Sequence, residues 1–192
     1  MMLHLDEITV RPIEPGDAES YFEIFSHPDV ARYDDFTPIT REELVTDMAR
    51  IEKYTPQSSF LELAVSILPS NKMVGIITID KKRKYTYLGY HFNPAYHGKG
   101  LAIRSVRMFV QSLSDIEAYK LRVVTHPDNK ASILLALKLG FSFLKNRTRK
   151  GILESVYRFD KRKWNELSAM TPSAHRSHTA AWRDSNTLAN YH

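Results

Sequence analysis

The sequence predicts an α+β fold, with a mixed, mostly antiparallel central sheet flanked by helices. Short stretches alternate apolar and polar residues as strands do, longer stretches repeat apolar residues every three or four positions as helices do, and Gly, Pro and Asn separate them. The expected order is strand, two helices, three strands, helix, strand, helix, two strands. A chain of 192 residues suits one domain with a sizeable core.

The first half of the chain is expected to supply a strand, two helices and a hairpin. Residues 8–13 form the strand, and Asp17 is a good N-cap for a helix that ends near residue 25. A capping box, Thr40-x-x-Glu43, begins the next helix. Residues 61–67 and 73–79 alternate in polarity around a Pro-Ser-Asn-Lys turn, which predicts two paired strands.

The second half is expected to begin with the central strand, residues 85–92, which is rich in aromatic residues and ends at an Asn-Pro break. A helix with one apolar face begins at Leu101, and residues 121–124 form a short buried strand. Asn129 caps a helix that is apolar almost all round and is therefore expected deep in the core. Residues 141–144 and 155–159 are expected to close the sheet as a hairpin with a basic tip.

A glycine turn separates the central strand from the helix at Leu101. Gly98 and Gly100 remove two Cβ atoms where the chain enters the helix, which opens backbone N–H groups to a ligand. These first N–H groups have no partner within a helix, and the helix dipole favours negative charge there. A phosphate or pyrophosphate is the natural guest, although a tight turn alone would also use two glycines. The stretch is too short for a P-loop and lacks the third glycine of the dinucleotide fingerprint.

The composition excludes several kinds of chemistry. The chain has no cysteine, so disulfides, thiolate metal sites and a cysteine acyl-enzyme are excluded. It has no apolar run long enough to span a bilayer and no leader-like start, so a cytoplasmic location is expected. The net charge is +5, and much of the excess lies at residues 81–84, 145–150 and 161–163. These clusters either form solvent-exposed hairpin tips and a basic chain end, or they attract a polyanion such as the phosphates of CoA or a nucleic acid.

The end of the chain differs in composition from the rest. Residues 165–192 are rich in Ser, Thr, Ala, His and Asn and show little periodicity, so they are expected to form a flexible tail or a non-native extension. Residues 5–164 are the expected domain. The histidines of the tail are not spaced for a metal ion, and no metal site is expected.

Several motifs in order carry a family resemblance. They are Leu-Gly-Tyr-His-Phe-Asn-Pro at 88–94 with Tyr-His-Gly-Lys-Gly-Leu-Ala at 96–102, and Asn-x-x-Ser at 129–132 with Leu-Gly-Phe at 139–141. Together with the opening residues 8–13, they resemble the GNAT superfamily of N-acetyltransferases, and more narrowly the RimJ/RimL-like branch that acetylates protein N-termini. The resemblance covers residues 5–164.

The resemblance implies that acetyl-CoA is the co-substrate. The glycine turn would hold its phosphates, the backbone at the end of the central strand would pair with the pantetheine arm, and Asn129 would contact CoA as well as cap its helix. The residues expected to bind acetyl-CoA are Phe92, Asn93, His97, Gly98, Lys99, Gly100, Leu101, Ala102 and Asn129.

An N-acetyltransferase also needs a base for the amine and a proton donor for the thiolate. Relatives often carry a glutamate at the position of Tyr87, so His91, on the same face of the strand, is the candidate base. Glu62 on a neighbouring strand is the second choice. A strand histidine with a structural hydrogen bond is the alternative for His91. By the resemblance, Ser132 donates a proton to the sulfur; otherwise it is a first-turn helix serine.

The expected function is therefore acetyl transfer from acetyl-CoA to a primary amine by direct attack. The acceptor is a protein N-terminal α-amino group or a small-molecule amine. Asp34 and Asp35, in a loop that resembles the acceptor side of relatives, would suit a cationic acceptor or simply form a solvated turn. The alternative function is a catalytically weak acyl-CoA-binding sensor or regulatory module. A homodimer is left open, no membrane partner is expected, and nucleic acid is disfavoured because no recognised binding motif is present.

Overall fold

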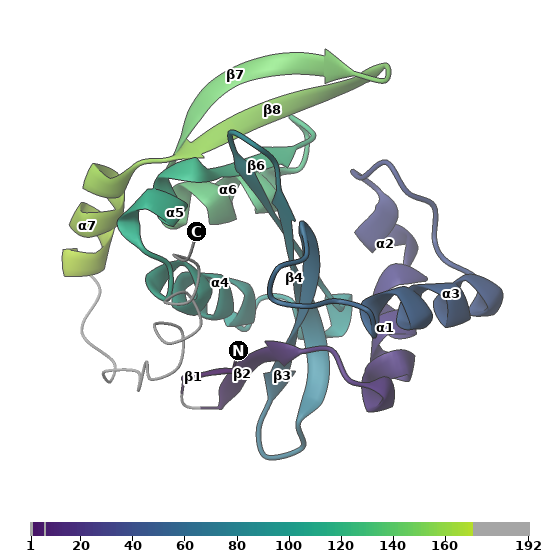
Figure 1. The fold of residues 1–192 in the computed structure, drawn as a ribbon. Coiled ribbons are helices and arrows are strands. Elements are labelled where there is room, and N and C mark those ends of the chain that lie inside the picture. The colour runs from purple at the N-terminus through teal and green to yellow at the C-terminus, as the bar shows by residue number, and fades with distance from the viewer. Residues whose placement is uncertain (1, 6, 171–192) are drawn as a thin grey trace, which may run out of the picture.

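The computed structural model describes residues 2–5 and 7–170 (Figure 1). Within them, eight strands form one sheet in the order β1-β2-β3-β4-β5-β6-β8-β7. Every neighbouring pair is antiparallel except β5 and β6, so the expected α+β fold with a mixed, mostly antiparallel sheet is confirmed. The strands are β1 (Leu3–Leu5), β2 (Ile8–Pro12), β3 (Phe60–Ile67), β4 (Lys72–Lys81), β5 (Thr86–Phe92), β6 (Leu121–Thr125), β7 (Phe141–Arg149) and β8 (Ile152–Phe159).

Helices lie on both faces of the sheet (Figure 1). One face carries α1 (Ala18–Phe25), α2 (Pro28–Ala31) and α3 (Arg41–Ile51), and the other carries α4 (Leu101–Gln111), α5 (Asp115–Lys120), α6 (Lys130–Lys138) and α7 (Lys161–Met170). Each set of helices buries its own hydrophobic core against the sheet. The short elements β1, α2 and α5, and the helix α7 at the end of the domain, were not predicted from the sequence.

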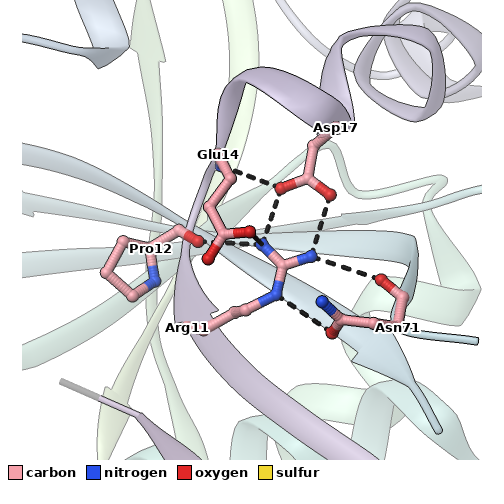
Figure 2. Close-up of polar contacts among 5 residues, drawn as sticks. All are labelled: Arg11, Pro12, Glu14, Asp17 and Asn71. Carbon is pink, nitrogen blue, oxygen red and sulfur yellow. Dashed lines mark hydrogen bonds and ion pairs between the residues drawn. The ribbon is translucent and has the colours of Figure 1, made fainter. Parts of the chain in front are cut away.

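A buried ion pair ties the start of α1 to the sheet (Figure 2). Arg11 donates to both carboxylate oxygens of Asp17, at 2.6 and 2.8 Å, and also to the side chain and carbonyl of Asn71 in the β3–β4 turn. Asp17 was expected to cap α1, but its side chain makes no cap hydrogen bond. Asp17 is the N-cap residue of α1 as predicted, but the buried guanidinium and the N–H of Glu14 bind its carboxylate in place of the first turn of the helix.

The parallel strands β5 and β6 separate soon after they meet. They pair only at Thr86 with Leu121 and at Tyr87 with Arg122. Within the described chain no strand pairs with the rest of that edge of β5, and at its end the Phe92 carbonyl lies 3.1 Å from His97 Nε2. The sheet is therefore split at its centre, directly before the glycine turn.

The helix α6 lies at this split and not deep in the core. The expectation of deep burial is wrong: Leu134 is 56% exposed and Leu137 is 41% exposed. The expected cap is confirmed, because Asn129 Oδ1 accepts a hydrogen bond from the N–H of Ser132 at 3.0 Å. The apolar surface of α6 is explained by an open cavity, described below, that it helps to line.

The expected boundary at residue 164 falls inside a helix. α7 continues to Met170, so residues 165–170 are helical and not part of a flexible tail. Trp164 holds this helix to the domain, since its ring packs 5.6 Å from that of Phe159 and its backbone lies against Gly140. The rest of the expected tail, residues 171–192, lies outside the described residues. None of the described helices has the length and hydropathy needed to cross a membrane.

Candidate active site

A cavity of about 750 Å³ opens where β5 and β6 separate. Its walls come from the last residues of both strands, the glycine turn and first turn of α4, one side of α6, and the segment around α2. It is therefore bounded by elements from both faces of the sheet. Its lining runs from the glycine turn before α4 to residues on β5.

The glycine turn has the conformation that the sequence predicted. Gly98 and Gly100 have φ values of 76° and 71°, which are left-handed and favour glycine. A Cβ built on either residue would meet no atom within 4 Å, so the space beside both is open. Gly100 is the N-cap of α4 and offers no side-chain cap, so the N–H groups of the first turn remain available. This geometry fits a phosphate group.

His91 lies in a pocket made by α1 and the loop after α2. Its Nε2 is 3.3 Å from Asp34 Oδ2, and its ring packs against Phe25 at 5.3 Å and Phe36 at 5.7 Å. Its Nδ1 is buried and has no hydrogen-bond partner among the described residues. If Nε2–H donates to Asp34, the lone pair remains on Nδ1, which is then the basic nitrogen.

Tyr90, the residue before His91, points to the opposite face of β5 and meets Ser132 there. The hydroxyl of Tyr90 donates to the Ser132 carbonyl at 3.1 Å and lies 3.2 Å from Ser132 Oγ. Burial raises the pKa of Tyr90 to about 12, so the phenol keeps its proton at neutral pH. Sequence reasoning missed Tyr90, although its place beside His91 on an alternating strand was a usable signal.

Glu62 lies outside the lining of the cavity. It is 5% exposed and is held by Arg50 at 3.1 Å, by the hydroxyl of Tyr21 at 3.3 Å and by that of Tyr54 at 3.2 Å. Burial raises the pKa of this carboxyl. The structure thus brings His91 and Ser132 to one cavity and places Glu62 in a separate buried network.

Most of the residues expected to bind acetyl-CoA line the cavity, but two do not. The lining contains Phe92, His97, Gly98, Gly100, Leu101, Ala102 and Asn129. Asn93 is absent from it: its N–H donates to the Val74 carbonyl at 3.0 Å and its side chain donates to Glu23 at 3.1 Å. Lys99 is also absent, with its Nζ 4.9 Å from the centre of the Tyr96 ring.

The loop after α2 forms one side of the mouth of the cavity. Tyr33 stacks on His126, directly after β6, with ring centres 5.8 Å apart. Asp34 lines the cavity, whereas Asp35 is exposed and lies outside the lining. One of the two expected carboxylates therefore reaches the site. Within residues 2–5 and 7–170, no group of three or more His, Asp or Glu side chains could hold a metal ion.

The part of the chain that contains the split in the sheet and the glycine turn is matched by a family model. The model described as "Acetyltransferase (GNAT) domain" covers residues 7–142. The chain belongs to the GNAT family of acetyltransferases. The uncharacterized N-acetyltransferase p20 of Bacillus licheniformis is 24% identical to this GNAT protein over 166 residues, which is 82% of this chain and 93% of p20. The chain is accordingly an N-acetyltransferase.

Solved structures share the fold. A GNAT-family acetyltransferase from Bacillus anthracis superposes with a TM-score of 0.72 at 19% identity, over 84% of this chain and 99% of that one. RimJ of Mycobacterium smegmatis, in complex with CoA-disulfide, gives a TM-score of 0.71 at 14% identity, over 88% and 93% of the two chains. RimL is a neighbour as well, so the resemblance to the RimJ/RimL-like branch is confirmed in the fold.

Proposed function

We propose that this GNAT protein transfers an acetyl group from acetyl-CoA to a primary amine by direct attack. One observation carries the proposal: the His91–Asp34 pair and the Tyr90–Ser132 pair face one cavity from opposite sides of β5, and the glycine turn lies at the end of that cavity. A base, a proton donor and a phosphate cradle are the groups that the reaction needs.

Acetyl-CoA would supply the activated acetyl group. The N–H groups after Gly100 would hold its phosphates, because the open space at Gly98 and Gly100 lets an anion approach the backbone. The unpaired edge of β5 would pair with the pantetheine arm as an added strand. This pairing uses the backbone from Leu88 to the N–H of Phe92. The Phe92 carbonyl lies 3.1 Å from His97 Nε2, and the N–H of Asn93 already donates to Val74.

The side chains would move two protons in opposite directions. His91 would take a proton from the amine while the new C–N bond forms, and Asp34 would stabilise the resulting imidazolium. As the C–S bond breaks, Ser132 would give its hydroxyl proton to the sulfur and be resupplied by Tyr90. A backbone N–H on the free edge of β5 would stabilise the oxyanion, an effect worth about 3 kcal/mol.

The acceptor class is part of the proposal. A protein N-terminus or a small amine would enter beside Asp34, where the carboxylate attracts a cation. We also propose a cytoplasmic location, which the absence of cysteine suits. The alternative, an acyl-CoA-binding sensor, is favoured by Tyr87, which stands where relatives often have a glutamate.

The test is release of free thiol from acetyl-CoA with a panel of peptide and small-molecule amines. The wild-type protein should release thiol only when an amine acceptor is present. His91→Gln and Ser132→Ala should each lower kcat by about 100-fold, in the range for general acid–base groups, with little change in the KM for acetyl-CoA. Glu62→Gln is the matched control and should keep kcat within about threefold. Binding of acetyl-CoA without turnover on any amine would favour the sensor instead.

A further inference from the structure

One part of the sheet surface carries an excess of positive charge. Residues paired across neighbouring strands point to the same face. Tyr87 pairs with Arg122 and Arg122 with Arg158, while Lys145, Arg147 and Arg149 pair with alternate residues of β8. The contact of Arg147 Nη1 with the Tyr87 hydroxyl, at 3.5 Å, places the β7 set on the same side as Tyr87. We call these cations the basic face: Arg122, Lys145, Arg147, Arg149 and Arg158.

The basic face is continuous with the side of the sheet that presents His91. Tyr87 and His91 are four residues apart on β5, so their side chains point the same way. α5 and α6 pack on the other side of β6, β7 and β8, and α1 packs on β4. Figure 1 shows the β7–β8 hairpin extending beyond the rest of the sheet. Since Thr125, the last residue of β6, pairs with Ser155, the hairpin continues past the end of β6, where Tyr33 stacks on His126.

Little within the described residues neutralises the basic face. Glu154 is the one acidic residue of β6, β7 and β8 and is already paired with Arg147 at 2.5 Å, while Asp80, which pairs with Tyr87 on β4, is bound by Lys82 at 2.7 Å. Lys145, Arg149 and Arg158 are exposed and form no ion pair with a described residue. The opposite side of the mouth carries carboxylates, with Asp34 beside His91 and Asp29 in the cavity lining. The Asp34 carboxylate therefore lies beside His91 where the amine would enter, with Arg32 and Lys138 also in the cavity lining and the cations of the basic face beyond it.

The charge pattern favours an anionic polypeptide over a second copy of this chain or a nucleic acid. β7 is an edge strand that contains no acidic residue, so antiparallel pairing with another β7 would oppose like charges. The rings of Tyr85 and Tyr87 are covered by Arg122 at 4.3 Å and Arg147 at 5.7 Å, and so are not free to stack on bases. An extended acidic segment would meet unpaired backbone on β7 and cations beside it.

We infer that the acceptor is a polypeptide N-terminus followed by acidic residues, whose amine enters beside the His91–Asp34 pair and whose carboxylates lie on the basic face. This inference rests on the proposed function, because it names the substrate class of the same site. It adds a specificity that the contacts of the amine with His91 and Asp34 do not give, because part of the binding energy comes from acidic residues of the acceptor that follow its N-terminus.

The test measures binding apart from catalysis. A twelve-residue peptide with a free serine N-terminus, five Glu or Asp residues and a C-terminal fluorophore is titrated with the full chain in 50 mM salt, with fluorescence anisotropy as the readout. Comparison probes are the same peptide with Gln and Asn in place of its acids, its N-acetylated form, and a single-stranded RNA of equal charge. Protein variants are Lys145→Glu with Arg149→Glu, and, as the control with the same change in net charge, Lys120→Glu with Lys163→Glu on α5 and α7.

Support for the inference requires that the acidic peptide bind at least tenfold more tightly than its neutral and N-acetylated forms. The Lys145/Arg149 variant should bind the acidic peptide about tenfold more weakly, because two attractive charge contacts become repulsive. The Lys120/Lys163 variant should lose less than about twofold in affinity, because neither residue contacts the peptide. Equal binding of the neutral or acetylated peptide, tighter binding of RNA, or an unaffected Lys145/Arg149 variant would overturn it. Peptide binding that persists when acetyl-CoA gives no thermal shift would overturn the proposed function alone.

Discussion

Replacing Gly100 by alanine should weaken acetyl-CoA binding about 100-fold while costing the fold little. Gly100 has a φ of 71°, and a non-glycine residue in this region costs about 1 kcal/mol. A Cβ there meets nothing within 4 Å, so no clash adds to that cost. For a domain of this size, about 1 kcal/mol lowers Tm by about 2–4 °C.

The effect on the ligand should be much larger than the effect on the fold. Acetyl-CoA at 100 times its Kd stabilises the wild-type protein by about 2.7 kcal/mol, or roughly 5–11 °C. If the added methyl removes two charge-assisted backbone hydrogen bonds to phosphate, the Kd rises by about 100-fold, since each is worth about 1.5 kcal/mol. The same acetyl-CoA concentration then adds about 0.4 kcal/mol, a shift of about 1 °C.

Gly151 is the matched control, and differential scanning fluorimetry is the assay. Gly151 has a φ of 80° in the β7–β8 turn, a Cβ there also meets nothing within 4 Å, and it does not line the cavity. Gly151→Ala should lower Tm as Gly100→Ala does, yet keep the whole acetyl-CoA shift. A full shift in Gly100→Ala would refute the assignment of the glycine turn as the phosphate site.

Three further changes test other parts of the molecule. Asp34→Asn should lower kcat for acetyl transfer about tenfold by removing one charge-assisted hydrogen bond, with the KM for acetyl-CoA unchanged in steady-state kinetics. Asp17→Ala should lower the unfolding free energy by about 3–5 kcal/mol in urea titrations, because it leaves the buried Arg11 unpaired; the exposed Glu14→Ala should change it by under about 0.5 kcal/mol. Burial raises the pKa of Glu62 above its ordinary 4.5, so the folded state holds that proton more tightly and stability falls as pH rises through this range. The unfolding free energy of Glu62→Gln minus that of the wild type should therefore increase as the pH is raised from 4.5 to 7 in the same urea titrations.

Each of these changes has an outcome that contradicts its reasoning. An Asp34→Asn enzyme with wild-type kcat would mean that the carboxylate does not assist the base. An Asp17→Ala protein as stable as Glu14→Ala would mean that the ion pair in Figure 2 adds no net stability. A stability difference between Glu62→Gln and wild type that stays constant or falls with rising pH would remove burial as the cause of the raised pKa.

The sequence by itself determined the features that depend on neighbours along the chain. The capping boxes and the glycine turn are local, and the left-handed φ values at Gly98 and Gly100 follow from residue type. Alternation along β5 likewise placed Tyr87 and His91 on one face before the strand partners were known. The order of the main strands and helices along the chain followed from the same patterns.

Only the tertiary structure decided which distant residues meet. No local pattern shows that Asp34 would contact His91 from 57 residues away, or that Tyr90 would reach Ser132 from 42 residues away. Asp17 had the sequence of a helix cap, yet a buried Arg11 competes for its carboxylate, because a charged partner in a low dielectric outweighs a backbone N–H. The burial of α6 was likewise decided by the tertiary structure. Its apolar sequence pattern predicts an apolar environment, but because β5 separates from β6, one side of the helix faces a cavity and not the core.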